Sequence, residues 1–385
     1  MRILFLARSL EVGGAERQLS ALATGLKRRG HEVEVALFYA GGALEAGARA
    51  AGVPVVTLDK RSRWDLARFT ARTLREIRRF RPDVVHGYLV APNLLAVAVR
   101  PLVPGARIVW GLRASDMDWS RYGRLQEASF AASRIAARFA DLLIVNSEAG
   151  ARYHAQQGFP VSTLRVVHNG IDLETWRPDR ERGLAARTRW GFGPADRVFG
   201  IAARLDPMKD HVTFLEAAVR VAVADGAARF VAIGGGLEPY ASELKRHPAA
   251  TRLAGRLVWA GETADMLSAY NALDALVLAS AFGEGFPNAV AEAMACGVPC
   301  AVTDVGDAAL VVGDEGIVVP AKDHAALALA MMTLAGPASP RAPRVAARDR
   351  IAGRFSVDAM VDATEALLVA LVSDRGLAPA VRSGK

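Results

Sequence analysis

Two glutamates in the stretch FGEGFPNAVAEAMACGVPC are candidates for a reactive or ligand-binding site. The stretch runs from Phe282 to Cys300 and places Glu284 and Glu292 eight positions apart, with a Gly-Phe-Pro-Asn segment just after the first. Two carboxylates near such a turn are compatible with an acid/base pair, a metal site or two charges at a helix end. The glutamates alone do not separate these three alternatives.

The segment AARLDPMKD supplies two cations at the end of a strand-like run. Arg204 ends the run VFGIAAR, and Lys209 follows five positions later. A guanidinium fork and an ammonium point charge suit a diphosphate. Two surface cations are the alternative, although Pro207 between them favours a shaped loop over a helix face.

Gly13 and Gly14 lie where the first strand-like run meets the first helix-like run, in the segment SLEVGGAERQ. Glycine lets the backbone approach a ligand closely, and a helix N-terminus favours an anion. The segment matches neither G-x-G-x-x-G nor the phosphate-binding loop with its lysine. A tight turn is therefore an equally good interpretation.

Pro287 suits the first turn of a helix, because the N–H that it lacks would have no partner there. The sequence NAVAEAMA continues as a helix former, which places Glu284 in the loop before the helix and Glu292 more than one turn inside it. The two carboxylates then need not touch. Backbone N–H groups of residues 286–288 would point at the helix start, where a phosphate fits.

Metal and nucleophile chemistry finds little support in the sequence. No His or Asp cluster and no Asp-x-Asp accompanies the two glutamates, and G-x-S-x-G is absent. Of seven scattered histidines, His86 and His168 stand at strand ends, where a functional and a structural role are both open. Cys296 and Cys300 are interpreted as buried free thiols, as in a reducing compartment.

Composition indicates a globular protein that favours anionic partners. The chain has 385 residues, 52% of them hydrophobic, and 48 Lys and Arg against 40 Asp and Glu give a formal net charge of +8. This balance suits nucleotides or a phospholipid surface, although a solvated basic face is the simpler interpretation. No aromatic-plus-basic motif predicts a nucleic-acid partner. No run of 18 apolar residues exists, so we expect a cytoplasmic protein that can rest peripherally on the inner face of the membrane.

The elements that must position these residues alternate between strand-like and helix-like runs. Short apolar runs predict buried parallel strands, and the amphipathic segments between them predict helices. Strands are expected at 2–7, 32–38, 53–58, 83–88, 106–112, 141–147, 164–170, 198–204, 229–236, 256–261, 275–280, 298–304 and 316–320. The pattern predicts an α/β protein with two doubly wound, Rossmann-like sheets, which bind ligands at the carboxyl ends of their strands.

The polar segment 174–197 interrupts this alternation and is interpreted as the linker and the entry to a second domain. We therefore predict an N-terminal domain over 1–180 and a second domain over 181–352. Residues 353–385 are expected to cross back to the first domain. Two such domains would place the carboxyl edges of their sheets on either side of a ligand-binding cleft.

Five motifs in order, GGAER, VNSE, HNGID, RLDPMK and EGFPNAVAE, together resemble the retaining glycosyltransferases of family 4. The resemblance covers about residues 1–372. It implies the two-domain GT-B fold, with an acceptor-binding first domain and a donor-binding second one. It also implies a nucleotide sugar as donor (with UDP, GDP or ADP left open), a hydroxyl acceptor, and no metal or other cofactor.

The resemblance implies a role for each matched residue. Arg204 and Lys209 match the pair that binds the donor diphosphate and its leaving charge. Glu284 matches the carboxylate beside the transferred sugar, and Glu292 matches the one that holds the ribose hydroxyls. The matched backbone that would cradle the sugar and phosphate, or close over the donor, comprises Gly285, Phe286, Pro287 and Asn288, and then Gly13 and Gly14.

Arg113 is a departure from the family pattern, because many members have a histidine at this place after the fifth strand. It stands in IVWGLRASDMD, where Asp116 follows. Arg113 and Asp116 are candidates for contact with the acceptor or the sugar, and Arg113 would suit an anionic acceptor. A structural ion pair between the two is the alternative. His86 is the nearest histidine candidate that remains.

The resemblance predicts transfer of a hexose, with retention and by a front-face mechanism, to a lipid-linked intermediate, a polysaccharide precursor or a small metabolite. A nucleotide-sugar epimerase of the same fold is one alternative, but it would need further acid/base carboxylates. A non-catalytic nucleotide-sugar-binding protein is the other, and such a protein could lose Glu284.

Overall fold

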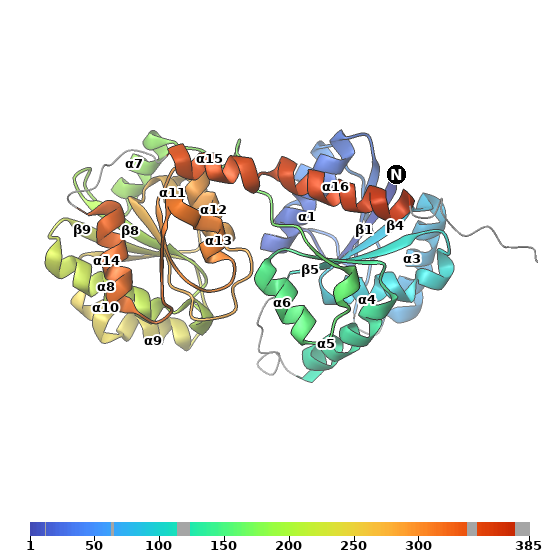
Figure 1. Cartoon of the computed structure of the whole chain (residues 1–385), viewed down its shortest axis with the longest axis horizontal. Helices are drawn as coiled ribbons and strands as arrows, with labels where there is room; N and C mark the ends of the chain where they lie inside the picture. Colours follow the sequence, from blue (N-terminus) through green and yellow to red (C-terminus); the bar gives the residue numbers. More distant parts are fainter. Residues whose placement is uncertain (12, 63–64, 114–123, 337–344, 374–385) are drawn as a thin grey trace, which may run out of the picture. The chain divides into compact units, whose positions relative to one another are not determined.

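The computed structural model describes residues 1–11, 13–62, 65–113, 124–336 and 345–373. The chain divides into two compact units, which we call unit 1 (Met1–Gly170 with Val357–Lys385) and unit 2 (Ile171–Ser356). Figure 1 shows the chain coloured by position in the sequence. The predicted boundaries at 180/181 and 352/353 are therefore displaced. The cause is local: Ile171 N–H donates to the carbonyl of Phe355, so the two passages of the chain between the units lie side by side.

Residues 174–197 do enter the second unit, as expected, but they are not a linker, because the whole segment belongs to unit 2. Its middle forms helix α7 (Arg180–Arg189). Its buried Arg187 guanidinium donates to the Asp274 carboxylate at 2.8 Å. The helix has no apolar stripe for a sequence pattern to find, because a paired charge occupies part of its buried face.

Unit 1 contains a seven-stranded sheet with parallel pairing throughout, in the order β3-β2-β1-β4-β5-β6-β7. Its strands are β1 (Arg2–Ala7), β2 (Glu32–Leu37), β3 (Val55–Thr57), β4 (Val84–Tyr88), β5 (Arg107–Leu112), β6 (Leu142–Val145) and β7 (Leu164–Val166). All seven were predicted from their apolar runs. The strand order reverses between β1 and β4, the kind of point at which open α/β sheets bind ligands.

Two apolar cores cover the two faces of this sheet, one beneath α1 and α16 and the other beneath α3 to α6. The helices are α1 (Gly14–Arg28), α2 (Glu45–Ala50), α3 (Leu66–Phe80), α4 (Val90–Ala98), α5 (Arg124–Ala136), α6 (Glu148–Gln156) and α16 (Val357–Ser373), with short 3₁₀ turns η1 (Arg100–Leu102), η3 (Ala137–Phe139) and η4 (Val161–Thr163). Helix α16 comes from the end of the chain and packs on α1, as Figure 1 shows in red against blue.

Unit 2 contains a six-stranded parallel sheet in the order β10-β9-β8-β11-β12-β13. Its strands are β8 (Arg197–Ala202), β9 (Ala228–Ile233), β10 (Leu257–Gly261), β11 (Ala275–Leu278), β12 (Cys300–Thr303) and β13 (Ile317–Val319). Each overlaps a run that was predicted as a strand, although β8 and β9 begin one residue before their predicted runs. Strands β8 and β11 are neighbours, which brings the loops that follow them to the same point on the sheet edge.

The remaining elements of unit 2 pack on both faces of its sheet. They are α7, η5 (Pro207–Lys209), α8 (His211–Ala224), α9 (Tyr240–Arg246), α10 (Pro248–Arg252), α11 (Met266–Asn271), α12 (Asn288–Ala295), α13 (Ala308–Val312), η6 (Gly313–Glu315), α14 (His324–Ala335) and α15 (Val345–Arg354). Cys296 and Cys300 are buried free thiols, as expected. Among the residues with described positions, no helix has the length and apolar character needed to cross a bilayer.

Candidate active site

Lys209 and Glu284 meet at the carboxyl edge of the unit 2 sheet. Lys209 ends the short turn η5 after β8, and Glu284 lies in the loop after β11. The Lys209 Nζ donates to Glu284 Oε1 at 2.5 Å, and the Ser280 hydroxyl donates to the same oxygen at 2.5 Å. Glu284 is 7% exposed, so both donors compensate a carboxylate that is largely removed from water.

Neighbouring loops fix the backbone around Glu284. The N–H of Ala281 donates to the carbonyl of Met208 at 2.9 Å, which joins the loop after β11 to η5. Gly306 has φ +65°, and a Cβ there would lie 2.4 Å from the carbonyl oxygen of Glu284. Only glycine fits this close approach, so the loop after β12 presses directly on the backbone that carries the carboxylate.

Arg204 lies apart from that buried pair. Its side chain is 69% exposed, and its guanidinium lies 3.8 Å from the Asp206 carboxylate. The loop beneath is firmly held, since Leu205 N–H donates to the carbonyl of Gly235 at 2.7 Å. An exposed cation on a fixed loop can turn toward an incoming anion at little cost in desolvation.

Glu292 is held by a residue that we did not single out from the sequence. It lies in α12 and is 6% exposed, and the buried Tyr270 hydroxyl on α11 donates to its Oε2 at 2.9 Å. Glu284 and Glu292 thus have different hydrogen-bond donors. This arrangement fits two separate roles better than a shared acid/base pair.

The start of α12 offers backbone groups more than side chains. Helix α12 begins at Asn288 with Pro287 as its N-cap, as the proline predicted. The Phe286 side chain is buried against Phe355, with ring centroids 5.3 Å apart, so it belongs to the core. The carbonyl of Gly285 accepts from the N–H of Asp307 at 3.1 Å, which orients this turn.

Gly13 and Gly14 form the N-terminus of α1 in unit 1. Gly13 is the N-cap in extended conformation, and Gly14 is the first helical residue. The Glu16 carboxylate folds back over this end, where a Cβ on Gly13 would lie 2.2 Å from Glu16 Oε2. An acidic side chain at a helix N-terminus matches the dipole there. A donor phosphate would have to take the place that Glu16 now occupies.

Arg113 follows β5 at the carboxyl edge of the unit 1 sheet. Its Nη1 donates to Asn169 Oδ1 at 3.0 Å, and its Nη2 donates to the Tyr88 hydroxyl at 2.6 Å. The guanidinium also lies over the Tyr88 ring, 4.7 Å from the centroid. Asp116, the predicted neighbour, lies outside the described residues.

His86 is completely buried beneath this cluster. Its ring packs between Phe5 and Tyr88, with both centroids 5.1 Å away. Burial and the nearby Arg113 charge lower the pKa of His86 to about 3, so the imidazole is neutral. A side chain without an exposed atom cannot touch a substrate, which favours the structural alternative for His86.

Sequence reasoning missed Ser280, Tyr270 and Tyr88 as partners of the charged groups. Ser280 and Tyr88 stand at the ends of predicted strands, and this position was the available signal. Tyr270 carries no such signal, because it lies in a helix 22 positions before Glu292. Asn169 is part of the HNGID motif, but the sequence did not indicate its contact with Arg113.

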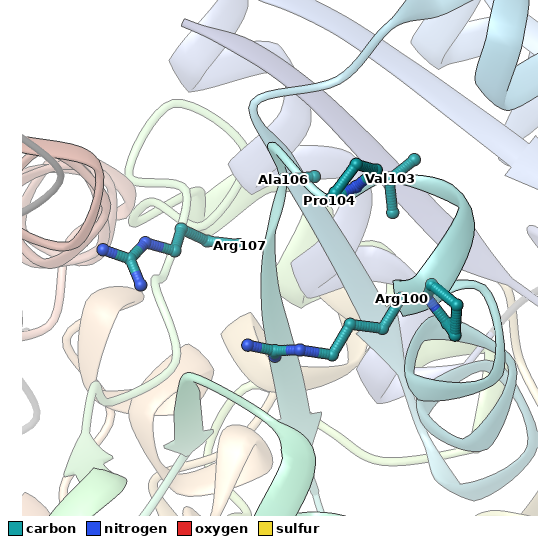
Figure 2. Close-up of a pocket in the computed structure, with 6 residues that line it drawn as sticks. Arg100, Val103, Pro104, Ala106 and Arg107 are labelled. Atoms are coloured by element: carbon teal, nitrogen blue, oxygen red, sulfur yellow. The ribbon is translucent and has the colours of Figure 1, made fainter.

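A separate pocket lies at the opposite edge of the unit 1 sheet, where β5 begins. Figure 2 shows its lining, with the Arg100 and Arg107 side chains extending along it. Both arginines pair with Asp141, at 2.9 Å and 3.5 Å. Parallel α/β sheets bind ligands at the carboxyl ends of their strands, and this pocket is at the amino ends. We therefore do not assign it to the active site.

Two parallel α/β units, each with ordered charged groups where its strands end, define the chain as a GT-B fold protein. The family model Glycosyltransferase Family 4 matches residues 12–175, and the model Glycosyl transferases group 1 matches residues 196–336. The chain belongs to the glycosyltransferases that these two models describe. The fold class and the family resemblance expected from the motifs are confirmed.

Solved structures with the same fold cover almost the whole chain. Anabaena HepE in complex with UDP is 24% identical with a TM-score of 0.80, over 96% of this chain and 100% of that chain. Sucrose-phosphate synthase from Thermosynechococcus elongatus is 18% identical with a TM-score of 0.76, over 97% of this chain and 100% of that chain. At these identities the likeness establishes the fold.

Curated relatives match over a smaller part of the chain. A D-inositol 3-phosphate glycosyltransferase of Mycobacterium sp. (strain JLS) is 33% identical over 182 residues, which are 46% of this chain and 40% of that relative. The corresponding enzyme of Mycobacterium bovis (strain BCG / Pasteur 1173P2) is 31% identical over 184 residues, 46% of this chain and 36% of its own length. This chain thus spans well under half the length of these relatives.

Proposed function

We propose that this protein is a retaining glycosyltransferase that moves a hexose from a nucleotide-diphosphate sugar to a hydroxyl acceptor. The observation that supports this most directly is the buried Lys209–Glu284 contact at the carboxyl edge of the unit 2 sheet. A cation and a carboxylate at one point can serve the two halves of a nucleotide sugar, its diphosphate and its hexose. Because HepE binds UDP, UDP is the first nucleotide to test as the carrier of the donor sugar.

In the proposed reaction the bond between the anomeric carbon and the diphosphate oxygen breaks first. Lys209 and Arg204 stabilise the negative charge that develops on the leaving diphosphate. The acceptor hydroxyl attacks from the same face, and its proton passes to an oxygen of the departing phosphate. Glu284 accepts hydrogen bonds from the sugar hydroxyls and thereby orients the reacting face.

Glu292 is proposed to hold the ribose hydroxyls of the donor. The Tyr270 hydroxyl occupies one of its carboxylate oxygens and so restricts its rotation. Unit 2 then binds the donor, and unit 1 binds the acceptor. The acceptor classes that we propose are a small metabolite, a polysaccharide precursor or a lipid-linked intermediate, and the inositol phosphate in the names of the curated relatives makes a phosphorylated metabolite the first to test.

We propose that neither a metal nor another cofactor takes part. Lys209 and Arg204 supply positive charge where a metal would otherwise stabilise the diphosphate. In the described part of the chain, no three His, Cys, Asp or Glu side chains gather as metal ligands would. We further propose a cytoplasmic location, peripheral on the inner face of the membrane if the acceptor is lipid-linked.

The first test compares transfer from a panel of nucleotide sugars by the wild-type protein and by Glu284→Gln. We expect the variant to lose about 100-fold or more in kcat, as when one transition-state hydrogen-bonding group is removed, while UDP affinity by calorimetry does not fall. EDTA should leave the wild-type rate unchanged. Glu238→Gln, on an exposed loop of the same unit, is the matched control.

Three outcomes would contradict parts of this proposal. Equal transfer by Glu284→Gln would remove that residue from the reaction. Binding of a nucleotide sugar without transfer or hydrolysis would favour a non-catalytic binding protein. A strict requirement for a divalent cation would contradict the metal-free mechanism.

A further inference from the structure

Arg113 carries a positive charge that its observed partners do not balance. Its hydrogen bonds go to the Asn169 amide and the Tyr88 hydroxyl, which are neutral groups. Burial raises the pKa of Tyr88, so the phenol remains protonated. Among the residues with described positions, no carboxylate forms an ion pair with Arg113.

The buried imidazole next to this guanidinium cannot supply the missing negative charge. A histidine is neutral or positive, and the pKa of His86 lies near 3, so it is neutral. The Arg113 charge therefore stands over an uncharged layer made by Tyr88 and His86. Within the described part of the chain, no negative side chain compensates the field of this guanidinium at the carboxyl edge of the sheet.

A partly buried guanidinium with neutral partners is a costly arrangement. Arginine stays charged at any physiological pH, and burial removes part of its hydration. The Nε–H of Arg113 is buried and has no hydrogen-bond partner among the described residues. Tyr88 and Asn169 fix the guanidinium in one orientation, and these two contacts use two of its five N–H donors. Such a group is prepared for an anion.

We propose that Arg113 binds an anionic group, a carboxylate or a phosphate, that one of the two substrates carries, and that it selects for that charge. This inference rests on the proposed glycosyl transfer. The group has two possible sources: a uronic acid as the transferred sugar, or a phosphate or carboxylate on the acceptor. Charge-assisted recognition by a fixed guanidinium predicts about 10-fold or greater discrimination against a neutral analogue.

The experiment uses matched probes that differ in one anionic group. Calorimetry gives the affinity of the wild-type chain for UDP, UDP-glucose and UDP-glucuronic acid, and the affinity of the UDP-saturated chain for inositol and inositol 3-phosphate. The same series is measured for Arg113→Met, which removes the charge, and Arg113→Lys, which keeps it. Arg138→Met, at an exposed site on η3, is the control for loss of one arginine.

We expect the wild-type chain to bind the charged member of one pair about 10-fold or more tightly, and the pair that shows it identifies the source. Arg113→Met should abolish the preference, and Arg113→Lys should retain part of it, while UDP affinity and thermal stability stay near the wild-type values. Equal binding within both pairs, or a preference that survives in Arg113→Met, overturns the inference. Absence of UDP binding in the wild-type chain would instead count against the proposed function.

Discussion

The Lys209 ammonium contacts Glu284 instead of standing beside Arg204, and this changes what donor binding requires. A diphosphate that binds Lys209 must compete with a carboxylate already 2.5 Å from Nζ. If Lys209 turns toward the phosphate, Glu284 Oε1 keeps only the Ser280 hydroxyl as a donor. A sugar hydroxyl can then replace the lost hydrogen bond, so binding of the diphosphate and of the sugar would be coupled.

Tyr270→Phe tests the role of Glu292 by removing one hydrogen bond to its carboxylate. The change removes the hydroxyl that donates to Glu292 Oε2 at 2.9 Å and leaves a buried carboxylate oxygen without that donor. We expect UDP affinity to fall by about 1–3 kcal/mol, because the carboxylate is no longer held toward the ribose. Calorimetry with UDP and with 2′,3′-dideoxy-UDP measures the effect.

The dideoxy nucleotide separates positioning from general destabilisation. It lacks the hydroxyls that Glu292 is proposed to bind, so Tyr270→Phe should change its affinity little. An equal loss for both nucleotides would mean that Tyr270 supports the unit as a whole and not the ribose contact. The melting temperature of the variant further distinguishes loss of the ribose contact from a general loss of stability.

At the scale of elements, the sequence predicted the strands well and the contacts between them poorly. Every strand overlaps a predicted apolar run, because strands of a parallel sheet are buried on both faces and therefore have continuous hydrophobic sequences. The Lys209–Glu284 contact joins residues 75 positions apart and depends on β8 pairing with β11. Local periodicity carries no information on that pairing.

Helix α7 is the clearest failure of sequence reasoning, and its cause is physical. Arg187 donates to Asp274, which lies 87 positions away, and to the carbonyl of Ala272. A helix held by a buried ion pair lacks the apolar stripe on which prediction depends. The family resemblance singled out Glu284, Glu292 and Arg113 as candidates, but it did not indicate the serine and the tyrosines that hydrogen-bond to them.

The contact between strand β2 and helix α3 leads us to predict that stability depends on pH. Glu34 is buried on β2 and contacts Arg79 and Glu76 on α3. Desolvation, and then the hydrogen bond with Glu76, raise the pKa of Glu34 from 4.5 to about 7. Between these values the folded chain holds a proton that the unfolded chain has lost, so stability should fall as pH rises, by at most ~1.4 kcal/mol per pH unit.

Glu34→Gln tests this dependence, because the amide keeps the shape and cannot titrate. Urea unfolding of the wild type at pH 5 and pH 7.5 should show a loss of stability that is smaller in Glu34→Gln. Glu32→Gln, an exposed change on the same strand, is the control. A wild-type slope that persists unchanged in Glu34→Gln would show that other groups cause it.

In the molecule as a whole, unit 1 is completed by α16, which follows unit 2 in the sequence. Helix α16 packs on α1 and closes one apolar core of the unit, with Val361 and Leu368 buried in it. The Glu365 carboxylate on α16 also forms an ion pair at 2.7 Å with Arg29, the C-cap of α1, and His31 Nε2 lies 2.7 Å from its other oxygen. Stability of unit 1 therefore depends on a helix that follows the whole of unit 2 in the sequence.

Gly25→Ala tests this dependence at the closest point between the two helices. A Cβ on Gly25 would lie 2.4 Å from Val361 Cγ2, so α16 would have to move away from α1. Overpacking of this kind destabilises by about 1–3 kcal/mol, although alanine is the better helix former. Gly47→Ala in α2 is the matched control, because no atom lies within 4 Å of the added Cβ there.

Urea unfolding of each variant measures the difference in stability. The double variant Gly25→Ala with Val361→Ala should regain part of the lost stability, because the smaller side chain makes room for the added Cβ. Should the single change Gly25→Ala prove as harmless as Gly47→Ala, α16 would not be firmly seated on α1, and the core of unit 1 would be stable without it.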